Sequence, residues 1–292
     1  MEVKTIAVIG AGTMGRGIAY AAAYGGYNTV LEDVSRHVLE NAVGWIRQSF
    51  DEGVARGKVE AGARAKALSL ITTANNVEDA ICDAELIIEA VPEELEMKLE
   101  LFTIFDKFAK MGAIFASNTS SLSITDFTDV TVSRDRCIGM HFFNPVPKMK
   151  LIELVRTPQT SDETVAICRE VAQRMGKEVV LVREAPGFIT TRVNALIGNE
   201  AFNMLEAGIG SAEDIDKALK LGLNHPMGPF ELVDLVGLDV LLNILEYLHR
   251  TLGEKYRPNA LLQQYVQEGR LGRKVGRGVY EYSQQKVVVR KV

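Results

Sequence analysis

The strongest constraint on the fold is a short glycine-rich loop, GAGTMG, near the amino terminus. The loop directly follows a run of β-favouring residues, KTIAVIG, and opens a helix-like stretch that closes at Gly25 and Gly26. A second β-favouring run, YNTVLEDV, comes next, so strand, helix and strand fit within about thirty residues. This arrangement is typical of a βαβ unit whose loop binds a dinucleotide.

Each glycine has a separate role in such a loop. Gly10 allows a tight turn, Gly12 lets a pyrophosphate approach the backbone, and Gly15 allows close packing of helix on strand. The helix that starts here offers free N–H groups to the phosphates. At the end of the second strand, either Glu32 or Asp33 can bind the ribose hydroxyls, and either acid disfavours the 2′-phosphate of NADP. The pattern predicts NAD as the cofactor and leaves the choice of ribose acid open.

The rest of the chain shows two kinds of pattern. Apolar, strand-like runs alternate with amphipathic, helix-like stretches as far as about residue 185. Such alternation predicts an α/β fold, with a Rossmann-type doubly wound, mostly parallel sheet that has helices on both faces. After Pro186 almost every stretch is helix-like. We therefore expect residues 1–185 to form an NAD-binding domain and residues 186–292 a second, all-helical domain.

Composition narrows the classes of function. The formal net charge of −5 argues against nucleic acid as a partner, and no stretch is apolar for long enough to span a bilayer. The three cysteines are scattered without metal-like spacing, which indicates a reducing compartment. None of the four histidines is grouped with carboxylates or cysteines at metal-ligand spacing. We expect a cytoplasmic protein without a membrane partner and without a metal site.

His141 and Glu153 lie in two apolar runs, RCIGMHFF and MKLIELV, which NPVPK joins. Both residues are six positions from Pro147, so antiparallel pairing about this proline would place their Cβ atoms about 5 Å apart. The carboxylate could then accept Nδ1–H, fix the tautomer and leave Nε2 to take a proton. For an isolated pair, a buried structural histidine is the better interpretation. Beside a dinucleotide loop, the pair fits a general base and its orienting partner.

Three other polar features have two interpretations each. Ser120 and Ser121 follow a strand at the edge where doubly wound sheets bind ligands, although serine is also common in plain turns. Glu89 and Glu93 flank another strand end, where a first-turn helix acid is the simpler interpretation of Glu93. Residues 47–66 are mildly basic in an acidic protein, and a solvated helix face explains them most simply.

Seven segments, taken together in this order, resemble the 3-hydroxyacyl-CoA dehydrogenase family, and most closely its bacterial 3-hydroxybutyryl-CoA type. The resemblance covers nearly the whole chain. It implies NAD-dependent oxidation of a short-chain (S)-3-hydroxyacyl-CoA to the 3-oxoacyl-CoA, by a homodimer whose helical domain forms the interface and part of the substrate cleft. The segments are GAGTMGRGIA, EAVPEELEMK, ASNTSSLSI, HFFNPVPKMKLIEL, PGFI, HPMGPFELVDLVGLD and GRKVGRGVYEY.

The resemblance also implies roles for particular residues. His141 would be the general base and Glu153 its partner, and Ser120 would bond the 3-oxygen of the substrate near the nicotinamide. Asp33 would hold the adenosine ribose. Ser49 and Arg56 match positions that contact coenzyme A, with Arg56 in place of a more usual lysine. The other positions that would line the NAD site are Gly10, Gly12, Met14, Gly15, Glu93, Lys98, Asn144 (also beside the substrate) and Lys274.

One departure from the family and one alternative function remain. Where the family often has an asparagine near the substrate, two residues after PGFI, this chain has Thr191, whose hydroxyl has a shorter reach. The alternative is a related NAD-dependent dehydrogenase of a free hydroxy acid or sugar acid. It would share the glycine loop and the histidine–glutamate pair and would differ in the acyl-carrier site. Arg56 and the basic stretch around it favour the acyl-CoA.

Overall fold

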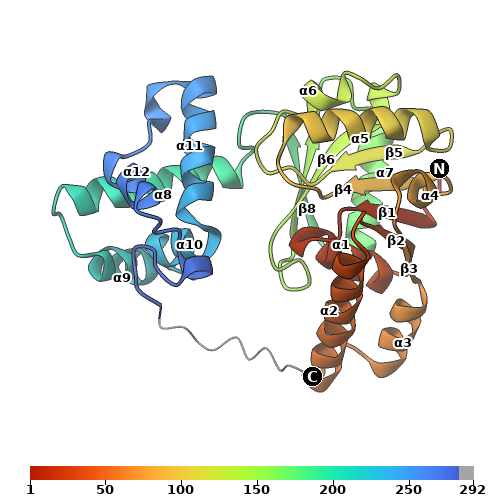
Figure 1. The fold of residues 1–292 in the computed structure, drawn as a ribbon, viewed down its shortest axis with the longest axis horizontal. Helices are drawn as coiled ribbons and strands as arrows, with labels where there is room; N and C mark the ends of the chain where they lie inside the picture. Colours follow the sequence, from red (N-terminus) through yellow and green to blue (C-terminus); the bar gives the residue numbers. More distant parts are fainter. Residues whose placement is uncertain (283–292) are drawn as a thin grey trace. The chain divides into compact units, whose positions relative to one another are not determined.

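The computed structural model describes residues 1–282, and the chain divides into two compact units between Ala185 and Pro186. The first unit is built around an eight-stranded sheet with the order β3-β2-β1-β4-β5-β6-β7-β8 (Figure 1). All neighbouring strands are parallel except β6 and β7, which are antiparallel. The strands are β1 Thr5–Ile9, β2 Asn28–Glu32, β3 Ile71–Ala74, β4 Leu86–Glu89, β5 Ile114–Ser117, β6 Cys137–Phe142, β7 Leu151–Arg156 and β8 Glu178–Arg183.

Helices cover both faces of this sheet. One face packs against α1, α2 and α7, whose apolar residues share a core with the strands. On the other face, Phe102 and Phe105 of α5 pack with Phe115 of β5 and Phe127 of α6. The doubly wound α/β fold predicted from the sequence is confirmed. The helices of this unit are α1 Thr13–Tyr24, α2 Arg36–Ala55, α3 Ala61–Ser69, α4 Val77–Ile81, α5 Leu95–Phe108, α6 Ile124–Thr128 and α7 Asp162–Arg174.

The helix starts follow local side-chain chemistry. The Ser35 hydroxyl accepts the N–H of Val38 and caps α2, and Ser161 caps α7 in the same way through the N–H of Thr164. By contrast, α1 begins after Gly12 with no side-chain cap and no acidic residue in its first turn. The N–H groups at the start of α1 therefore remain available to a ligand.

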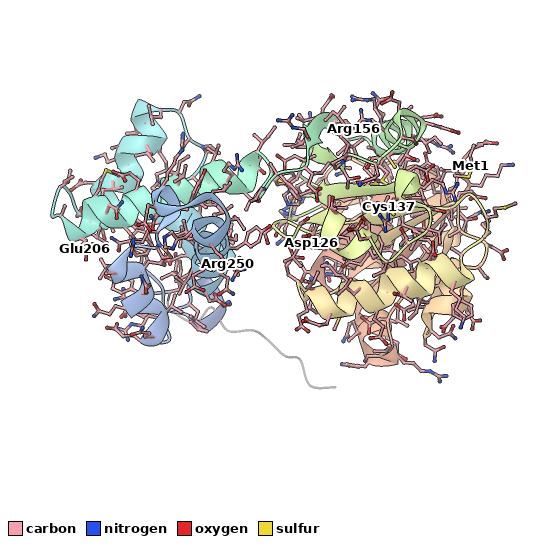
Figure 2. The ribbon with its side chains drawn as sticks, turned by 90° about the horizontal axis from the view of Figure 1, so that it is seen from above. Met1, Asp126, Cys137, Arg156, Glu206 and Arg250 are labelled. Carbon is pink, nitrogen blue, oxygen red and sulfur yellow. The ribbon has the colours of Figure 1, made fainter. Side chains whose placement is uncertain are left out.

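The cysteines are free thiols in different surroundings. Cys137, at the start of β6, lies among the packed side chains of the first unit, whereas Asp126 lies at its surface (Figure 2). Burial raises the pKa of the Cys137 thiol to about 11 and that of Cys168 to about 12, so neither forms a reactive thiolate at neutral pH.

The second unit is helical and has its own apolar core. Phe202 of α8 packs edge-on against Phe230 of α10 and Tyr265 of α12. In residues 1–282, no helix is both long enough and apolar enough to cross a membrane. The helices of this unit are α8 Thr190–Glu206, α9 Ala212–Gly222, α10 Pro229–Val236, α11 Leu238–Leu252 and α12 Ala260–Gln267.

Candidate active site

The glycine loop lies between β1 and α1, and its glycines are needed for different reasons. Gly10 has a φ of +96°, and a Cβ there would lie 2.9 Å from the carbonyl oxygen of Ala90. A Cβ on Gly15 would lie 1.7 Å from the carbonyl oxygen of Gly10. A Cβ on Gly12, however, would meet no protein atom within 4 Å. The protein itself requires Gly10 and Gly15, while Gly12 keeps open a space above the start of α1 that suits a pyrophosphate.

The two acids at the end of β2 have different environments. The Asp33 carboxylate faces the loop, where it accepts the N–H of Ala11 (3.1 Å) and that of Ser35 (2.9 Å). Glu32 is only 3 % exposed, and its Oε1 has no hydrogen-bond partner among the described residues. Burial, and then the negative charge of Asp33, raise the pKa of Glu32 to about 7. Asp33 is therefore the acid of this pair whose carboxylate is hydrogen-bonded to the glycine loop.

His141 and Glu153 pair as the sequence predicts. They are direct partners in the antiparallel ladder of β6 and β7, with 6 % and 1 % of their surfaces exposed. The imidazole Nδ1 lies 2.8 Å from the carboxylate Oε2. Because an ionised carboxylate only accepts hydrogen bonds, this contact assigns the ring proton to Nδ1.

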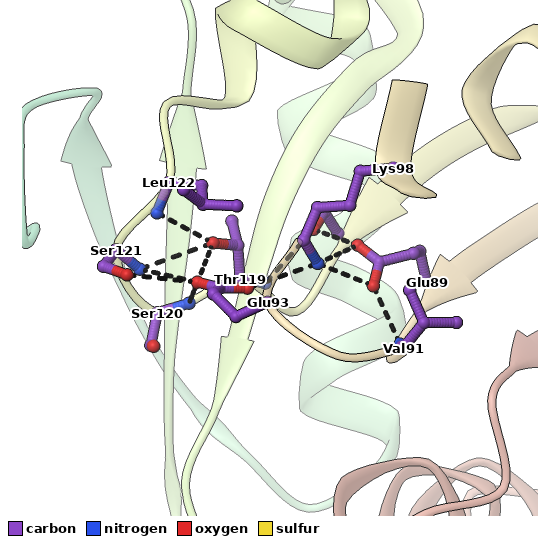
Figure 3. A network of polar contacts seen from close by, with 9 residues as sticks. Glu89, Val91, Glu93, Lys98, Thr119, Ser120, Ser121 and Leu122 are labelled. Atoms are coloured by element: carbon purple, nitrogen blue, oxygen red, sulfur yellow. Dashed lines mark hydrogen bonds and ion pairs between the residues drawn. The ribbon is translucent and has the colours of Figure 1, made fainter. Parts of the chain in front are cut away.

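The loop that carries Ser120 is fastened by Glu93 (Figure 3). One carboxylate oxygen of Glu93 accepts the hydroxyl of Thr119 (2.5 Å), the N–H of Ser120 (3.1 Å), and both the N–H and the hydroxyl of Ser121 (3.2 Å each). The hydroxyl of Ser120 points away from this carboxylate (Figure 3). Glu93 therefore holds the backbone of Ser120 and leaves its hydroxyl for another partner.

Lys98 supports Glu93 from inside the protein. Its ammonium is 1 % exposed and lies 2.7 and 2.8 Å from the two oxygens of Glu89 and 3.3 Å from Glu93 (Figure 3). Burial acts to raise the pKa of Glu93, but the charge of Lys98 and the hydrogen bonds from Thr119 and Ser120 outweigh it and hold that pKa below its usual value. Glu93 is thus a stable anion at neutral pH.

The sequence alone gave no reason to pair Lys98 with Glu89. Glu89 is fully buried at the end of β4, where it also accepts the hydroxyl of Ser117 (2.5 Å) and the N–H of Val91 (2.8 Å). The available signal was a glutamate that ends an apolar strand, LIIE, and therefore requires a buried cation. Lys98 is enclosed by the two acids and therefore does not face the predicted NAD site itself. It acts on that site by holding the Glu93 carboxylate in place.

Two contacts hold the glycine loop, the loop that carries Ser120 and the strand that bears His141 together at one edge of the sheet. The side-chain oxygen of Asn118, just after β5, accepts the N–H of Phe142 (2.9 Å), so the Ser120 loop is tied to the strand that bears His141. Val146, in the turn after His141, packs so closely on Gly17 of α1 that a Cβ there would lie 2.9 Å from it. Asn144 lies exposed in this same turn. Glycine loop, serine loop and histidine are therefore neighbouring parts of one unit.

The other predicted residues belong to elements outside this cluster, in the first or the second unit. Ser49 is on α2, and Arg56 is the residue directly after this helix, where it is exposed and pairs with Glu52 at 3.4 Å. Thr191 and Lys274 belong to the second unit, which begins at Pro186. Thr191 lies in the first turn of α8, and the Lys274 ammonium lies 2.6 Å from both oxygens of Asp239. In residues 1–282, no cluster of three or more potential ligands is arranged for a metal ion.

The geometry of the first unit defines a class of protein. An open space above Gly12, a helix start without acids and the acid Asp33 at the end of β2 fit NAD, and a carboxylate-bound histidine beside them fits a dehydrogenase. Residues 5–185 match the family model of the 3-hydroxyacyl-CoA dehydrogenase NAD-binding domain, and residues 187–282 match that of the C-terminal domain. The chain belongs to the 3-hydroxyacyl-CoA dehydrogenase family.

Individual relatives agree with this assignment. The chain is 43 % identical over 281 residues to a 3-hydroxybutyryl-CoA dehydrogenase of Bradyrhizobium diazoefficiens, with 96 % of each chain covered. It is 41 % identical over 288 residues to the mitochondrial hydroxyacyl-coenzyme A dehydrogenase of Homo sapiens, which covers 96 % of this chain and 91 % of the relative. The crystal structure of (S)-3-hydroxybutyryl-CoA dehydrogenase PaaH1 from Ralstonia eutropha superposes with a TM-score of 0.93 at 42 % identity and covers 97 % of this chain and 100 % of that one.

These findings confirm the family, the enzyme class and the cofactor predicted from the sequence. The protein is an oxidoreductase with a Rossmann-type NAD-binding domain and a helical C-terminal domain, and NAD is its cofactor.

Proposed function

We propose that the protein catalyses the reversible, NAD-dependent oxidation of a short-chain (S)-3-hydroxyacyl-CoA, such as 3-hydroxybutyryl-CoA, to the 3-oxoacyl-CoA. The observation that carries the proposal is the buried 2.8 Å contact between His141 and Glu153, at the sheet edge that also holds the glycine loop. The names of the relatives in Bradyrhizobium diazoefficiens and Ralstonia eutropha support the short acyl chain.

In this proposal His141 moves the proton. During oxidation, its Nε2 takes the proton of the substrate hydroxyl while the C3–H bond breaks, and during reduction the imidazolium returns it to the 3-oxygen. Glu153 keeps Nδ1 protonated and stabilises the imidazolium by its charge. NAD, when bound, supplies the hydride acceptor.

Ser120 positions the substrate. Its hydroxyl points away from the Glu93 carboxylate and would donate to the 3-oxygen, where negative charge grows as the proton leaves (Figure 3). Asn144 would contact both substrate and cofactor from the turn after β6, and Thr191 would contact the substrate from α8.

The remaining cofactor contacts come from the loop and from charged residues. Gly10, Gly12, Met14 and Gly15 would bind the pyrophosphate, and Asp33 would bind the adenosine ribose. Glu93 and Lys274 would line the rest of the NAD site, with Lys98 acting through Glu93. Ser49 and Arg56 would bind coenzyme A.

One comparison of substrates tests the proposal. Oxidation of NADH should proceed with acetoacetyl-CoA and be at least roughly a hundredfold slower, in kcat/KM, with free acetoacetate, because only the former can use the binding energy of coenzyme A. Equal rates with both substrates would exclude the acyl-CoA and favour a dehydrogenase of free hydroxy acids.

A homodimer and a cytoplasmic location complete the proposal. Large apolar side chains remain exposed on the second unit, which supports a protein interface there: Leu221 76 %, Leu223 66 %, Leu235 51 % and Val236 50 %. The free thiol of the exposed Cys82 supports a reducing compartment. Sedimentation equilibrium of the wild type and of a Leu221→Glu/Leu223→Glu variant tests the dimer, which the variant should weaken.

A further inference from the structure

Arg16, in the first helical turns of α1, is a cation without an anionic partner. Its guanidinium carbon lies 4.6 Å from the centre of the Trp45 ring of α2. In the part of the chain that the structure describes, no carboxylate forms an ion pair with it, and its Nε is buried without a hydrogen-bond acceptor. The aromatic ring is thus the contact that the protein provides for this charge.

A buried donor without an acceptor destabilises the folded protein, and more so when the donor is charged. Burial lowers the pKa of Arg16, yet a guanidinium starts so high that it stays protonated at neutral pH. An oxyanion would relieve this cost, and the planar fork of an arginine matches a phosphate particularly well. Stacking on Trp45 fixes the plane of the guanidinium, so that its donors keep one orientation toward such a ligand.

The position of Trp45 on α2 indicates which phosphate this would be. Because a helix turns by about 100° per residue, Trp45 and Ser49 of α2 and Arg56, which directly follows this helix, fall on one stripe, with about 16 Å along the axis between the first and the last. This stripe is the one proposed above to bind coenzyme A. The pyrophosphate of NAD, in contrast, has the free N–H groups at the start of α1.

We propose that Arg16 and Trp45 form a phosphate-binding subsite for the coenzyme A part of the substrate, at the opposite end of the stripe from Arg56. The subsite rests on the proposed function, since it takes its ligand from the acyl-CoA. The ring of Trp45 supports the guanidinium of Arg16, and the positive charge of Arg16 binds the phosphate. The pair extends the binding surface for coenzyme A from α2 to α1.

Trp45 is the only tryptophan in the chain, so its fluorescence reports directly on the subsite. The full-length protein is titrated with CoA, with pantetheine, which has no phosphate, and with NAD. In Arg16→Met the Kd for CoA should rise about tenfold, while the Kd values for pantetheine and NAD stay unchanged. Arg16→Lys keeps the charge and loses the fork, so its Kd for CoA should lie between those of wild type and Arg16→Met.

Arg174→Met is the matched control. Arg174 also stacks on an aromatic ring, with its guanidinium carbon 4.5 Å from the centre of Tyr27, but its Nε donates to the carbonyl oxygen of Gly25. Its replacement should leave the Kd for CoA unchanged, and far-UV circular dichroism checks that each variant is folded.

The outcomes separate the subsite from the function. An unchanged Kd for CoA in Arg16→Met would overturn the subsite, and so would a weaker Kd for NAD alone, which would assign Arg16 to the dinucleotide loop. A wild-type protein that neither binds CoA nor reduces acetoacetyl-CoA would overturn the proposed function and the subsite together. Wild-type turnover of acetoacetyl-CoA with equal CoA binding by all variants would overturn only the subsite.

Discussion

Both units of the protein bury carboxylates, but they give them different partners. In the first unit, Glu89 lies against the ammonium of Lys98, and Glu153 lies against the imidazole of His141. In the second unit, Asp216 and Asp234 are 2 % and 1 % exposed and accept hydrogen bonds from backbone N–H groups and tyrosine hydroxyls. The first kind of partner is an ammonium or an imidazole, whose charge can act on a ligand, and the second kind consists of donors that are neutral at neutral pH.

The buried acids of the second unit fasten one segment to two helices. Asp216 of α9 accepts the N–H groups of Phe230 and Glu231 at the start of α10, and also the hydroxyl of Tyr280. Asp234 of α10 accepts the backbone N–H of Tyr280 and, through a second contact, the hydroxyl of Tyr282. Burial alone therefore does not mark a catalytic acid, because the nature of the partner decides what the acid can do.

Glu32 is a third case, a buried acid with neither kind of partner at its Oε1. The contrast between the units leads to four predictions, from the largest expected effect to the smallest.

The largest effect should come from His141→Gln. Turnover should fall by roughly two to four orders of magnitude, the usual contribution of a general base, while the KM for NAD and the free energy of unfolding change little. Steady-state kinetics measure the turnover and the KM, and urea denaturation measures the free energy of unfolding. Turnover at the wild-type level would show that the His141–Glu153 pair is as structural as the acids of the second unit.

Asp234→Ala should lower the stability of the protein and leave its turnover nearly unchanged. The free energy of unfolding should fall by about 3 kcal/mol, because buried N–H and hydroxyl donors lose a charged acceptor, whereas kcat per folded molecule should stay within roughly tenfold of wild type. Urea denaturation of this variant is compared with that of Asp214→Ala, which removes an exposed aspartate of the same unit and should cost far less. A large loss of kcat with unchanged stability would show that Asp234 serves catalysis, and that the buried acids of the second unit are not purely structural.

Asp33→Ala tests which acid of β2 binds the cofactor. The KM for NAD should rise roughly tenfold or more through the loss of charged hydrogen-bond acceptors, with kcat largely preserved. The matched control is Glu32→Gln, because Glu32 is only 3 % exposed and the substitution should leave the KM for NAD nearly unchanged. If Glu32→Gln raised this KM and Asp33→Ala did not, Glu32 would be the ribose acid.

The smallest effect concerns the stability of Glu32→Gln as a function of pH. The folded pKa of Glu32, about 7, is above its usual value of 4.5, so its neutral form is favoured and the wild type loses stability as pH rises between these values. The variant has no charge to bury at this position. Relative to wild type, it should gain on the order of 1 kcal/mol between pH 5 and pH 8. Urea denaturation at both pH values measures the gain, and a constant difference would contradict a raised pKa of Glu32 in the folded protein.

Much of the fold could be predicted because its signals are local. The GAGTMG loop, the alternation of strand-like and helix-like stretches, and the equal distance of His141 and Glu153 from Pro147 are all properties of short segments. Three helices, α3, α6 and α7, were not identified from the sequence; α3 has almost no apolar period, and α6 is only five residues long. The pairing of Lys98 with Glu89 could not be predicted either, because it depends on which face of α5 meets the end of β4.

The sequence by itself therefore determined the βαβ unit, the cofactor class and the register of the His141–Glu153 pair, since each follows from spacing along one short stretch of chain. Only the tertiary structure decided that Asp33 faces the glycine loop, that Lys98 supports Glu93 from within, and that Arg16 stacks on Trp45 without an anionic partner. The physical reason is the same in all three cases. The burial of a charge and the identity of its partner depend on neighbours that packing brings together from distant parts of the chain.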